Sequence, residues 1–331
     1  MFFIFYIILE VIYYSAILIF NKYKEDNMKI VTHDGTFHTD EVFAIALIKK
    51  FITSKIEVIR TRDEKILNEA KEDKSIFVID VGREYNFYKR NFDHHQREFD
   101  KTWYNEDTLF SSCGLVWEFL KKRGYLKKFS KFTLSNIEKK LIKKIDAHDN
   151  GQCFWSLSNM IKICNRDNNK EEDFNKALDI AKVYLDNIFY QENHSDKLHS
   201  IFREDLEKYD NNKIFISSIS NNGSFLKHLS QKTNALILIY EQKDTDNSSR
   251  WYSKAITKQK FNNGNKDCII SALAPESWRG LSDEELILRT GLKGSVFVHK
   301  TGYLCVSKNK KTAINMAKAM LDNIEKIKTF D

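Results

Sequence analysis

Short apolar segments alternate with helical segments from Met28 onward, and this alternation restricts the fold more than any other feature of the chain. The pattern predicts three strands and two intervening helices, at residues 29–32, 40–51, 56–60, 62–72 and 75–80. Thr39 is the expected N-cap of the first helix. Strands that alternate with helices form a mainly parallel sheet whose faces the helices cover, and ligands bind at the carboxyl ends of its strands. We therefore predict an α/β fold with a site at that edge.

The second half of the chain has a different pattern, which indicates a second domain. Helical patterns dominate residues 111–146 and 171–209, and short strand patterns follow from Lys213 onward. A chain of 331 residues is long enough for two domains that each bury a core. We predict a domain with a mainly parallel sheet flanked by helices over residues 28–200, and a smaller α+β domain over residues 212–331.

The first 27 residues form a separate segment. Residues 2–20 are almost entirely apolar and long enough to cross a membrane, with Glu10 as an acidic exception and Lys22 and Lys24 behind them. No basic region precedes Phe2, as a secretory signal would require. Two interpretations stay open: an N-terminal anchor, or a segment outside the folded protein. Membrane contact is expected only if the segment is retained.

The charge of the chain indicates which class of partner to expect, and its cysteine content indicates which cellular compartment. The chain has 53 Lys and Arg residues against 46 Asp and Glu residues, a formal charge of +7 that attracts polyanions. Ordinary solubility charge would produce the same excess, so a nucleic-acid partner is supported but not established. The five cysteines are scattered without a Cys-x-x-Cys pair, which gives no sign of a disulfide framework or a thiolate zinc site. A reducing intracellular compartment is expected, whether cytoplasm, nucleus or mitochondrion.

Histidine and carboxylate side chains gather where the first strands end. His33 follows the first strand and Asp80 ends the third, so both are expected on the same edge of a parallel sheet. Gly35 permits a tight turn, so that His33, His38 and Asp40 can converge. The alternative for this turn is a histidine-rich loop with an ordinary helix cap.

Two further groups of such residues strengthen the metal interpretation. The tripeptide Asp93-His94-His95 offers two imidazoles and a carboxylate, which suit a divalent ion such as Mn²⁺, Mg²⁺ or Zn²⁺. Asp146 and Asp149 follow an apolar helical segment. An unpaired carboxylate beside buried apolar residues is costly, so a purely structural role is disfavoured.

The chain resembles the MYG exonuclease family of the DHH phosphoesterase superfamily. The resemblance covers nearly the whole chain after Met28, and it rests on motifs that begin at residues 32, 78, 92, 111, 145, 276 and 297. They are Thr-His-Asp-Gly-Thr-Phe-His-x-Asp-Glu, Val-Ile-Asp-Val-Gly, Phe-Asp-His-His-Gln, Ser-Ser-Cys-Gly-Leu-Val-Trp, Ile-Asp-Ala-x-Asp-Asn-Gly, Glu-Ser-Trp-Arg-Gly-Leu and Phe-Val-His-Lys-Thr-Gly. Elsewhere in the superfamily an aspartate stands where this chain has His38.

The resemblance implies a DHH-type phosphoesterase that uses two divalent ions, Mn²⁺ or Mg²⁺, to hydrolyse RNA as an exonuclease. It implies two sets of ligands, His33 and His38 for one ion and Asp40, His94 and either Asp146 or Asp149 for the other. Asp80 would bridge the ions and take part in catalysis. His95 would face the substrate phosphate as an acid or electrophile. Asp93 would take part in catalysis or orient its neighbours.

The expected substrate contacts are polar or cationic side chains from both domains, namely Arg97, Ser111, Ser112, Arg279, His299 and Lys300. The two serines stand at a helix start, where they could donate to a phosphate oxygen or form a plain N-cap. In the second domain, Trp278 and Arg279 together with His299 and Lys300 combine an aromatic face with positive charge, which suits phosphate binding and base stacking. The alternative is a core tryptophan with solvated basic residues.

Two other functions stay open on the sequence. A pyrophosphatase or a small-nucleotide phosphohydrolase of the same superfamily would have a similar first domain. A non-catalytic protein could use metals only to stabilise its fold while it binds RNA. Single-stranded RNA is the expected partner in the preferred interpretation, and a homodimer is left open.

Overall fold

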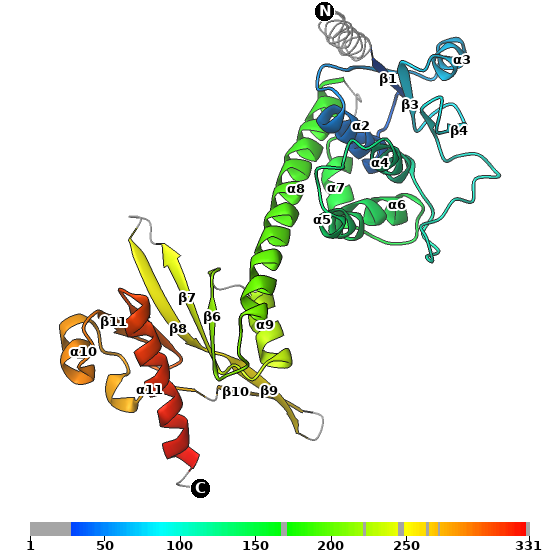
Figure 1. The fold of residues 1–331 in the computed structure, drawn as a ribbon. Coiled ribbons are helices and arrows are strands. Elements are labelled where there is room, and N and C mark those ends of the chain that lie inside the picture. The colour runs from blue at the N-terminus through cyan, green and yellow to red at the C-terminus, as the bar shows by residue number, and fades with distance from the viewer. Residues whose placement is uncertain are drawn as a thin grey trace, which may run out of the picture. The chain divides into compact units, whose positions relative to one another are not determined.

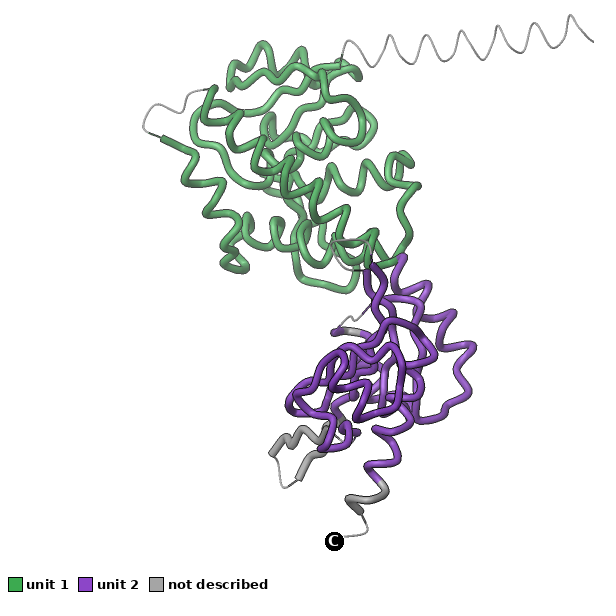
Figure 2. The backbone as a smooth tube through the Cα atoms, turned by 90° about the vertical axis from the view of Figure 1, so that its left-hand side faces the viewer, with its two compact units in different colours: residues 1–196 green, residues 197–331 purple. Residues whose placement is uncertain are grey.

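The computed structural model describes residues 28–166, 171–220, 223–243, 248–262, 265–270 and 272–328. The chain divides into two compact units, residues 1–196 (unit 1) and residues 197–331 (unit 2) (Figure 2). The expectations for residues 1–27 lie outside the described residues. Among the described helices, none combines the length and the apolar character needed to cross a membrane.

Unit 1 is built on a five-stranded sheet with strand order β2-β1-β3-β5-β4. The strands are β1 (Lys29–Thr32), β2 (Glu57–Arg60), β3 (Ile76–Ile79), β4 (Tyr85–Asn86) and β5 (Asn91–Phe92). Four of them run parallel, and the edge strand β4 is antiparallel to β5. The mainly parallel sheet predicted from the alternation is thus confirmed. Its consequence is that the residues following β1, β3 and β5 share one edge.

Helices account for most of the rest of unit 1 (Figure 1). They are α2 (Thr39–Phe51), α3 (Glu64–Glu72), α4 (Ser112–Lys122), α5 (Lys131–Ile137), the π-helical turn η1 (Glu138–Ile142), α6 (Lys143–Asp149), α7 (Ser156–Lys162) and α8 (Glu171–Glu207). Residues 39–48 of α2 are all buried, because α4, α6, α7 and β3 pack around this helix. That burial explains its nearly continuous apolar sequence. It also means that polar side chains at the start of α2 lie inside the protein.

Unit 2 has a second five-stranded sheet, with strand order β11-β12-β8-β7-β6. Its strands are β6 (Ile214–Ser217), β7 (Ile237–Lys243), β8 (Ser249–Ala255), β11 (Ser295–Val298) and β12 (Leu304–Ser307), and β9 (Thr257–Asn262) and β10 (Asn265–Ile270) form a separate ribbon. Its helices are α9 (Gly223–Lys232), the short 3-10 helix η2 (Glu276–Trp278), α10 (Asp283–Thr290) and α11 (Lys310–Lys328). Only β6 and β7 pair in parallel in the five-stranded sheet, so the α+β prediction is confirmed.

One local prediction was wrong: Thr39 is not the N-cap of α2. His38 occupies that position, with an extended backbone at φ −115°, and Thr39 is the first helical residue. The backbone N–H of His38 donates to the Glu41 carboxylate at 2.6 Å, so a side chain of the first turn satisfies the amide of the N-cap residue. A carboxylate at the third helical position can satisfy the N-cap amide in this way. The cap therefore uses Glu41.

Candidate metal centre

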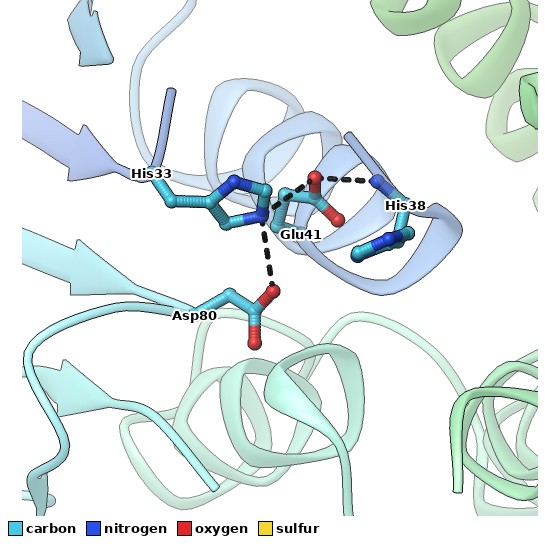
Figure 3. Close-up of side chains that lie close together, drawn as sticks. All are labelled: His33, His38, Glu41 and Asp80. Carbon is cyan, nitrogen blue, oxygen red and sulfur yellow. Dashed lines mark hydrogen bonds and ion pairs between the residues drawn. The ribbon is translucent and has the colours of Figure 1, made fainter. Parts of the chain in front are cut away.

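His33 and Asp80 lie together at the carboxyl edge of the sheet because β1 and β3 are parallel neighbours in register. The Nε2 atom of His33 lies 3.4 Å from Oδ2 of Asp80 and 3.2 Å from Oε1 of Glu41. With His38, these residues offer ligand atoms that all lie within 4.8 Å of one another (Figure 3). We call His33, His38, Glu41 and Asp80 cluster A. The structure thus brings together three side chains that the sequence assigned to metal binding and one, Glu41, that it did not.

A second group of ligand atoms lies around His94. Its Nε2 atom is 3.2 Å from Oδ2 of Asp149, 3.4 Å from Oδ1 of Asp80 and 3.8 Å from Oδ2 of Asp40. Asp40, His94 and Asp149 meet the same 4.8 Å limit, and we call them cluster B. Asp80 directs Oδ2 towards His33 and Oδ1 towards His94. Its carboxylate therefore lies between the two clusters, as a bridge between two ions requires.

The local backbone explains how these carboxylates come to lie together. Asp40 and Glu41 are in the first turn of α2, where the helix dipole favours negative charge. Asp80 directly follows β3 with φ at +56°, a left-handed backbone that is uncommon and strained for a residue other than glycine. Asp149 is the last residue of α6. Three separate elements thus direct acidic groups to one place.

Several polar atoms of the clusters lack partners. Both carboxylate oxygens of Asp40, Oε2 of Glu41 and Nε2 of His94 are buried without a hydrogen-bond partner among the described residues. Burial raises the pKa of Asp40 well above its ordinary value, and the charges of Asp149 and Asp80 raise it further. A divalent cation would satisfy these atoms and neutralise the repulsion, since carboxylates and imidazoles are ligands for Mn²⁺, Mg²⁺ and Zn²⁺. The residues therefore fit a metal centre.

The two buried histidines hold positive charge against the carboxylates. Nδ1 of His33 donates to the Asp34 carbonyl at 2.9 Å, which leaves Nε2 facing Asp80 and Glu41. Burial opposes charge on this ring, but Asp80 and Glu41 outweigh it and raise the pKa of His33 to about 10. Asp149 and Asp80 likewise outweigh burial and raise the pKa of His94 to about 10. A bound ion would take the place of these protons, and the Asp34 carbonyl would fix the orientation of the His33 ring, as metal ligands require.

His95 differs from His94 because it is exposed. Its side chain is 59% accessible, and its Nδ1 atom lies 2.8 Å from Oδ1 of Asp93. The backbone N–H groups of Arg83 and His95 also donate to the Asp93 carboxylate, at 2.6 Å and 3.1 Å. The hydrogen bond that His95 donates to Asp93 raises the pKa of His95. Asp93 is thus placed to orient His95, and it lies outside both clusters.

The structure separates the two candidate carboxylates of α6. Asp149 belongs to cluster B, whereas Asp146 lies outside both clusters. Oδ1 of Asp146 accepts hydrogen bonds from Ser111 Oγ at 2.6 Å and from Gly114 N at 3.0 Å, and Oδ2 accepts one from Trp103 Nε1 at 2.7 Å. Burial raises the pKa of Asp146 to about 7 although these donors lower it. The oxygens of Asp146 are thus bonded within the protein, and of the two candidates only Asp149 lies among the clustered ligand atoms.

Ser111 and Ser112 also have protein partners instead of an open position for a phosphate. Both are fully buried, and Ser112 Oγ donates to Oδ1 of Asp80 at 3.0 Å. Ser111 is the N-cap residue of α4, but its hydroxyl donates to Asp146 and not to the helix backbone. Ser111 thus occupies the N-cap position without a side-chain cap bond, and both hydroxyls donate to carboxylates of the site. A contact of these serines with phosphate stays a prediction.

A cleft of about 540 Å³ opens beside cluster A. Its lining includes His33, His38, Asp80 and His95, together with residues of α3 and of the segment after β3. The cationic side chains of the lining are Arg62, Lys71 and Arg83, with Glu64 as an acidic neighbour, and Arg62 also pairs with Asp34 at 3.3 Å. The cleft is of the size that holds small ligands or part of a polymer. It can bring a negatively charged group next to the clusters.

The motifs at these positions are those of a described family. The model of the uncharacterised protein family UPF0160, named MYG1 exonuclease, matches residues 29–321. The chain belongs to the MYG1 exonuclease family. An MYG1 protein of Chlamydia pneumoniae is 30% identical over 293 residues, which are 86% of this chain and 93% of that protein. The MYG1 exonuclease of Rattus norvegicus is 28% identical over 337 residues, 88% of this chain and 84% of that protein.

Solved structures give a weaker likeness. A pGpG-specific phosphodiesterase, PggH from Vibrio cholerae, shares 15% sequence identity at a TM-score of 0.29, and the match covers 90% of this chain and 99% of that chain. A TM-score this low supports no inference about this member of the MYG1 exonuclease family.

The remaining predicted substrate residues of this MYG1 family member are Arg97, close to His95 in sequence, and three residues of unit 2. Arg97 is exposed, in the loop behind His95. In unit 2, Arg279 Nε donates to the Ala274 carbonyl at 3.0 Å, and His299 Nδ1 lies 2.8 Å from Thr301 Oγ1. Lys300 is exposed beside His299, while Trp278 packs against the core of unit 2. Their role in substrate binding stays a prediction.

Sequence reasoning missed Glu41 and the three cationic residues that line the cleft, Arg62, Lys71 and Arg83. Glu41 follows Asp40 directly, and a glutamate at the third position of a helix is the signal of a capping box that could have marked it. Arg83 lies three residues after Asp80, on the same edge of the sheet, and proximity to that edge was its signal. Arg62 and Lys71 carry no comparable signal, because a charged residue on or just before a helix is usually only solvated.

Proposed function

We propose that this protein is a metal-dependent phosphodiesterase that hydrolyses RNA from an end. The observation that carries the proposal is the pair of clusters joined by Asp80, with buried ligand atoms that have no hydrogen-bond partner among the described residues. His33, His38, Glu41 and Asp80 would hold one divalent ion, and Asp40, His94 and Asp149, together with Asp80, would hold the other. Such a pair of ions, Mn²⁺ or Mg²⁺, activates water and stabilises the attacking and leaving oxygens of a phosphoester. Membership of a family named for exonucleases supports the same reaction class.

The residues of the cleft supply binding and positioning. Arg62, Lys71 and Arg83 line the cleft with positive charge that attracts the phosphates of a nucleic acid. His95 also lines the cleft, and its hydrogen bond to Asp93 favours the protonated ring. A protonated imidazole can donate to a phosphate oxygen or give a proton to a leaving group. Asp93 fixes the ring for this task.

The decisive experiment measures hydrolysis by the full-length protein with Mn²⁺. We expect mononucleotides to be released from single-stranded RNA that is labelled at one end. Asp80→Asn should lower the rate by a factor of about 1,000 or more. Catalytic groups that act as a unit depend on one another, so the loss of one removes most of the catalysis. Asp100→Asn is the matched control, since Asp100 is an exposed carboxylate of the same unit outside the cleft. Circular dichroism and thermal unfolding would show that both variants are folded.

Three results would contradict the proposal in different ways. Release of phosphate from pyrophosphate, with RNA left intact, would favour the small-molecule phosphohydrolase alternative. Equal RNA hydrolysis by the wild type and by Asp80→Asn would remove the clusters from the mechanism. Metal binding and RNA binding without hydrolysis of either substrate would favour the non-catalytic alternative.

A further inference from the structure

A second depression lies at the opposite edge of the sheet of unit 1. Its volume is about 320 Å³, and it is lined by Lys74, Tyr88, Arg90, Phe119, Arg123 and Tyr125. Lys74 precedes β3 and Arg90 precedes β5, whereas Asp80 and Asp93 follow these two strands. Because β3 and β5 are parallel, the depression is at their amino ends and the metal clusters are at their carboxyl ends. It is therefore separate from the proposed active site.

Two arginine side chains converge in this depression. The guanidinium of Arg90 lies 4.7 Å from the ring centre of Phe77 and 6.0 Å from that of Phe119. The guanidinium of Arg123 lies 5.7 Å from the same Phe119 ring and 5.2 Å from that of Phe87. Arg90 comes from a left-handed turn at φ +67°, and Arg123 is the C-cap residue of α4. Two distant segments thus direct like charges onto one aromatic side chain.

The positive charges of the depression lack acidic partners. Among the described residues, no carboxylate lies within 4.0 Å of the charged groups of Lys74, Arg90 or Arg123, although Lys89, Lys121 and Lys122 nearby in sequence are all paired. Arg90 is partly buried, and burial lowers its pKa, with a further lowering by the charge of Arg123. A buried charge without a counter-ion is unfavourable, and two adjacent cations add repulsion. An anion bound between the two arginines would relieve both effects.

The chemistry of the lining indicates what kind of anion fits. A guanidinium can donate two parallel N–H bonds to phosphate oxygens. A depression lined by two arginines therefore suits a phosphate group. The carbonyl end of α4 carries a partial negative charge of only about half a unit, which three full positive charges exceed. Tyr125 is half-buried and Tyr88 is 74% exposed, so an aromatic face at the rim is open to a flat ring. The volume of the depression is near the lower end of sites for small molecules.

We propose that this depression binds a small phosphate monoester that carries an aromatic ring, such as a nucleoside monophosphate. Arg90 and Arg123 contact the phosphate, Lys74 adds charge at the rim, and a tyrosine face takes the ring. This site does not depend on the proposed phosphodiesterase activity, because it shares no residue with the metal clusters or with the cleft beside them.

The test is the binding of AMP to the full-length protein in the presence of EDTA, measured by isothermal titration calorimetry. We expect one saturable site. Arg123→Gln should weaken binding about tenfold or more, since a charge-assisted pair to phosphate is lost. Arg90→Met, which keeps the packing on Phe77, should have the same effect. Because Arg123 is exposed, its variant keeps the test decisive even if the Arg90 variant does not fold.

Matched controls separate this site from the active site and from general charge. Lys55→Gln removes one exposed positive charge elsewhere in unit 1 and should leave AMP affinity unchanged, as should Asp80→Asn in the metal clusters. Inorganic phosphate should compete with AMP, and adenosine should compete far less. Absence of saturable binding, equal affinity in Arg123→Gln and the wild type, or equal competition by adenosine would overturn the proposal.

Discussion

Asp146 and Asp149 lie about one turn apart in α6, yet they have different surroundings. Asp149 approaches His94, whereas the oxygens of Asp146 accept hydrogen bonds from Trp103, Ser111 and Gly114. Both carboxylates are on the same side of the helix, so helical periodicity could not decide between them. Only the tertiary placement of α4 against α6 shows which one is already satisfied.

This difference predicts opposite effects of two matched substitutions. Asp149→Asn should weaken Mn²⁺ binding at least tenfold and leave the free energy of unfolding of the metal-free protein nearly unchanged, because it removes a ligand charge. Asp146→Asn should lower that free energy by about 2 kcal/mol, because the amide NH₂ must face a donor. Calorimetric metal titration and urea unfolding measure the two effects. Weaker Mn²⁺ binding in Asp146→Asn, with unchanged Mn²⁺ binding in Asp149→Asn, would show that Asp146 is the ligand.

Asp93 lies outside both clusters, so its effect should appear in turnover and not in metal binding. We expect Asp93→Asn to lower kcat for RNA hydrolysis by a factor of about 100, because the His95 ring loses the charge that orients it. KM and Mn²⁺ affinity should stay close to the wild-type values. If His95→Gln loses kcat but Asp93→Asn keeps the wild-type kcat, Asp93 does not orient His95.

At the scale of elements, the sequence predicted the long apolar strands and helices of unit 1 well. β1 has the predicted bounds, and the predicted strand at 75–80 contains β3. The two-residue strands β4 and β5 were missed because so short a segment has no periodicity. β5 matters for function, since its carboxyl end places Asp93 and His94 beside Asp80. The strand that completes the site was thus the one with the weakest sequence signal.

The contact between α4 and α6 depends on the absence of a side chain at Gly114. A Cβ atom there would overlap the Asp146 carboxylate and lie 2.7 Å from Phe110 Cδ1. We expect Gly114→Ala to lower the free energy of unfolding by about 3 kcal/mol, because neither neighbour can move freely. Gly223→Ala in α9 is the control, since a Cβ meets nothing within 4 Å there, and it should be neutral or slightly stabilising. Urea unfolding followed by fluorescence would measure both. An unchanged midpoint in Gly114→Ala would contradict the tight packing.

At the scale of the whole molecule, the two units have separate cores and different chemistry. Among the described residues, every group of three or more candidate metal ligands belongs to unit 1. The predicted substrate residues Arg279, His299 and Lys300 belong to unit 2. The sequence could suggest this division, because strand and helix patterns change along the chain. A pattern of elements does not, however, indicate which side chains of one unit meet those of the other.

Metal binding should therefore stabilise unit 1 selectively. In the metal-free protein the clusters hold four carboxylates, Asp40, Glu41, Asp80 and Asp149. Because the unfolded chain has no preformed site, we expect the folded state to bind Mn²⁺ more tightly than the unfolded chain. At a Mn²⁺ concentration of about 100 times Kd, linkage predicts an increase of about 2.7 kcal/mol in the free energy of unfolding. Hydrogen exchange with mass spectrometry, with Mn²⁺ and with EDTA, would locate the increase. Protection should rise in α2, β3 and α6 and stay constant in β7, β8 and α11. Asp149→Asn should lose most of the gain, whereas an equal rise in both units, or none, would show that the clusters are not the metal site.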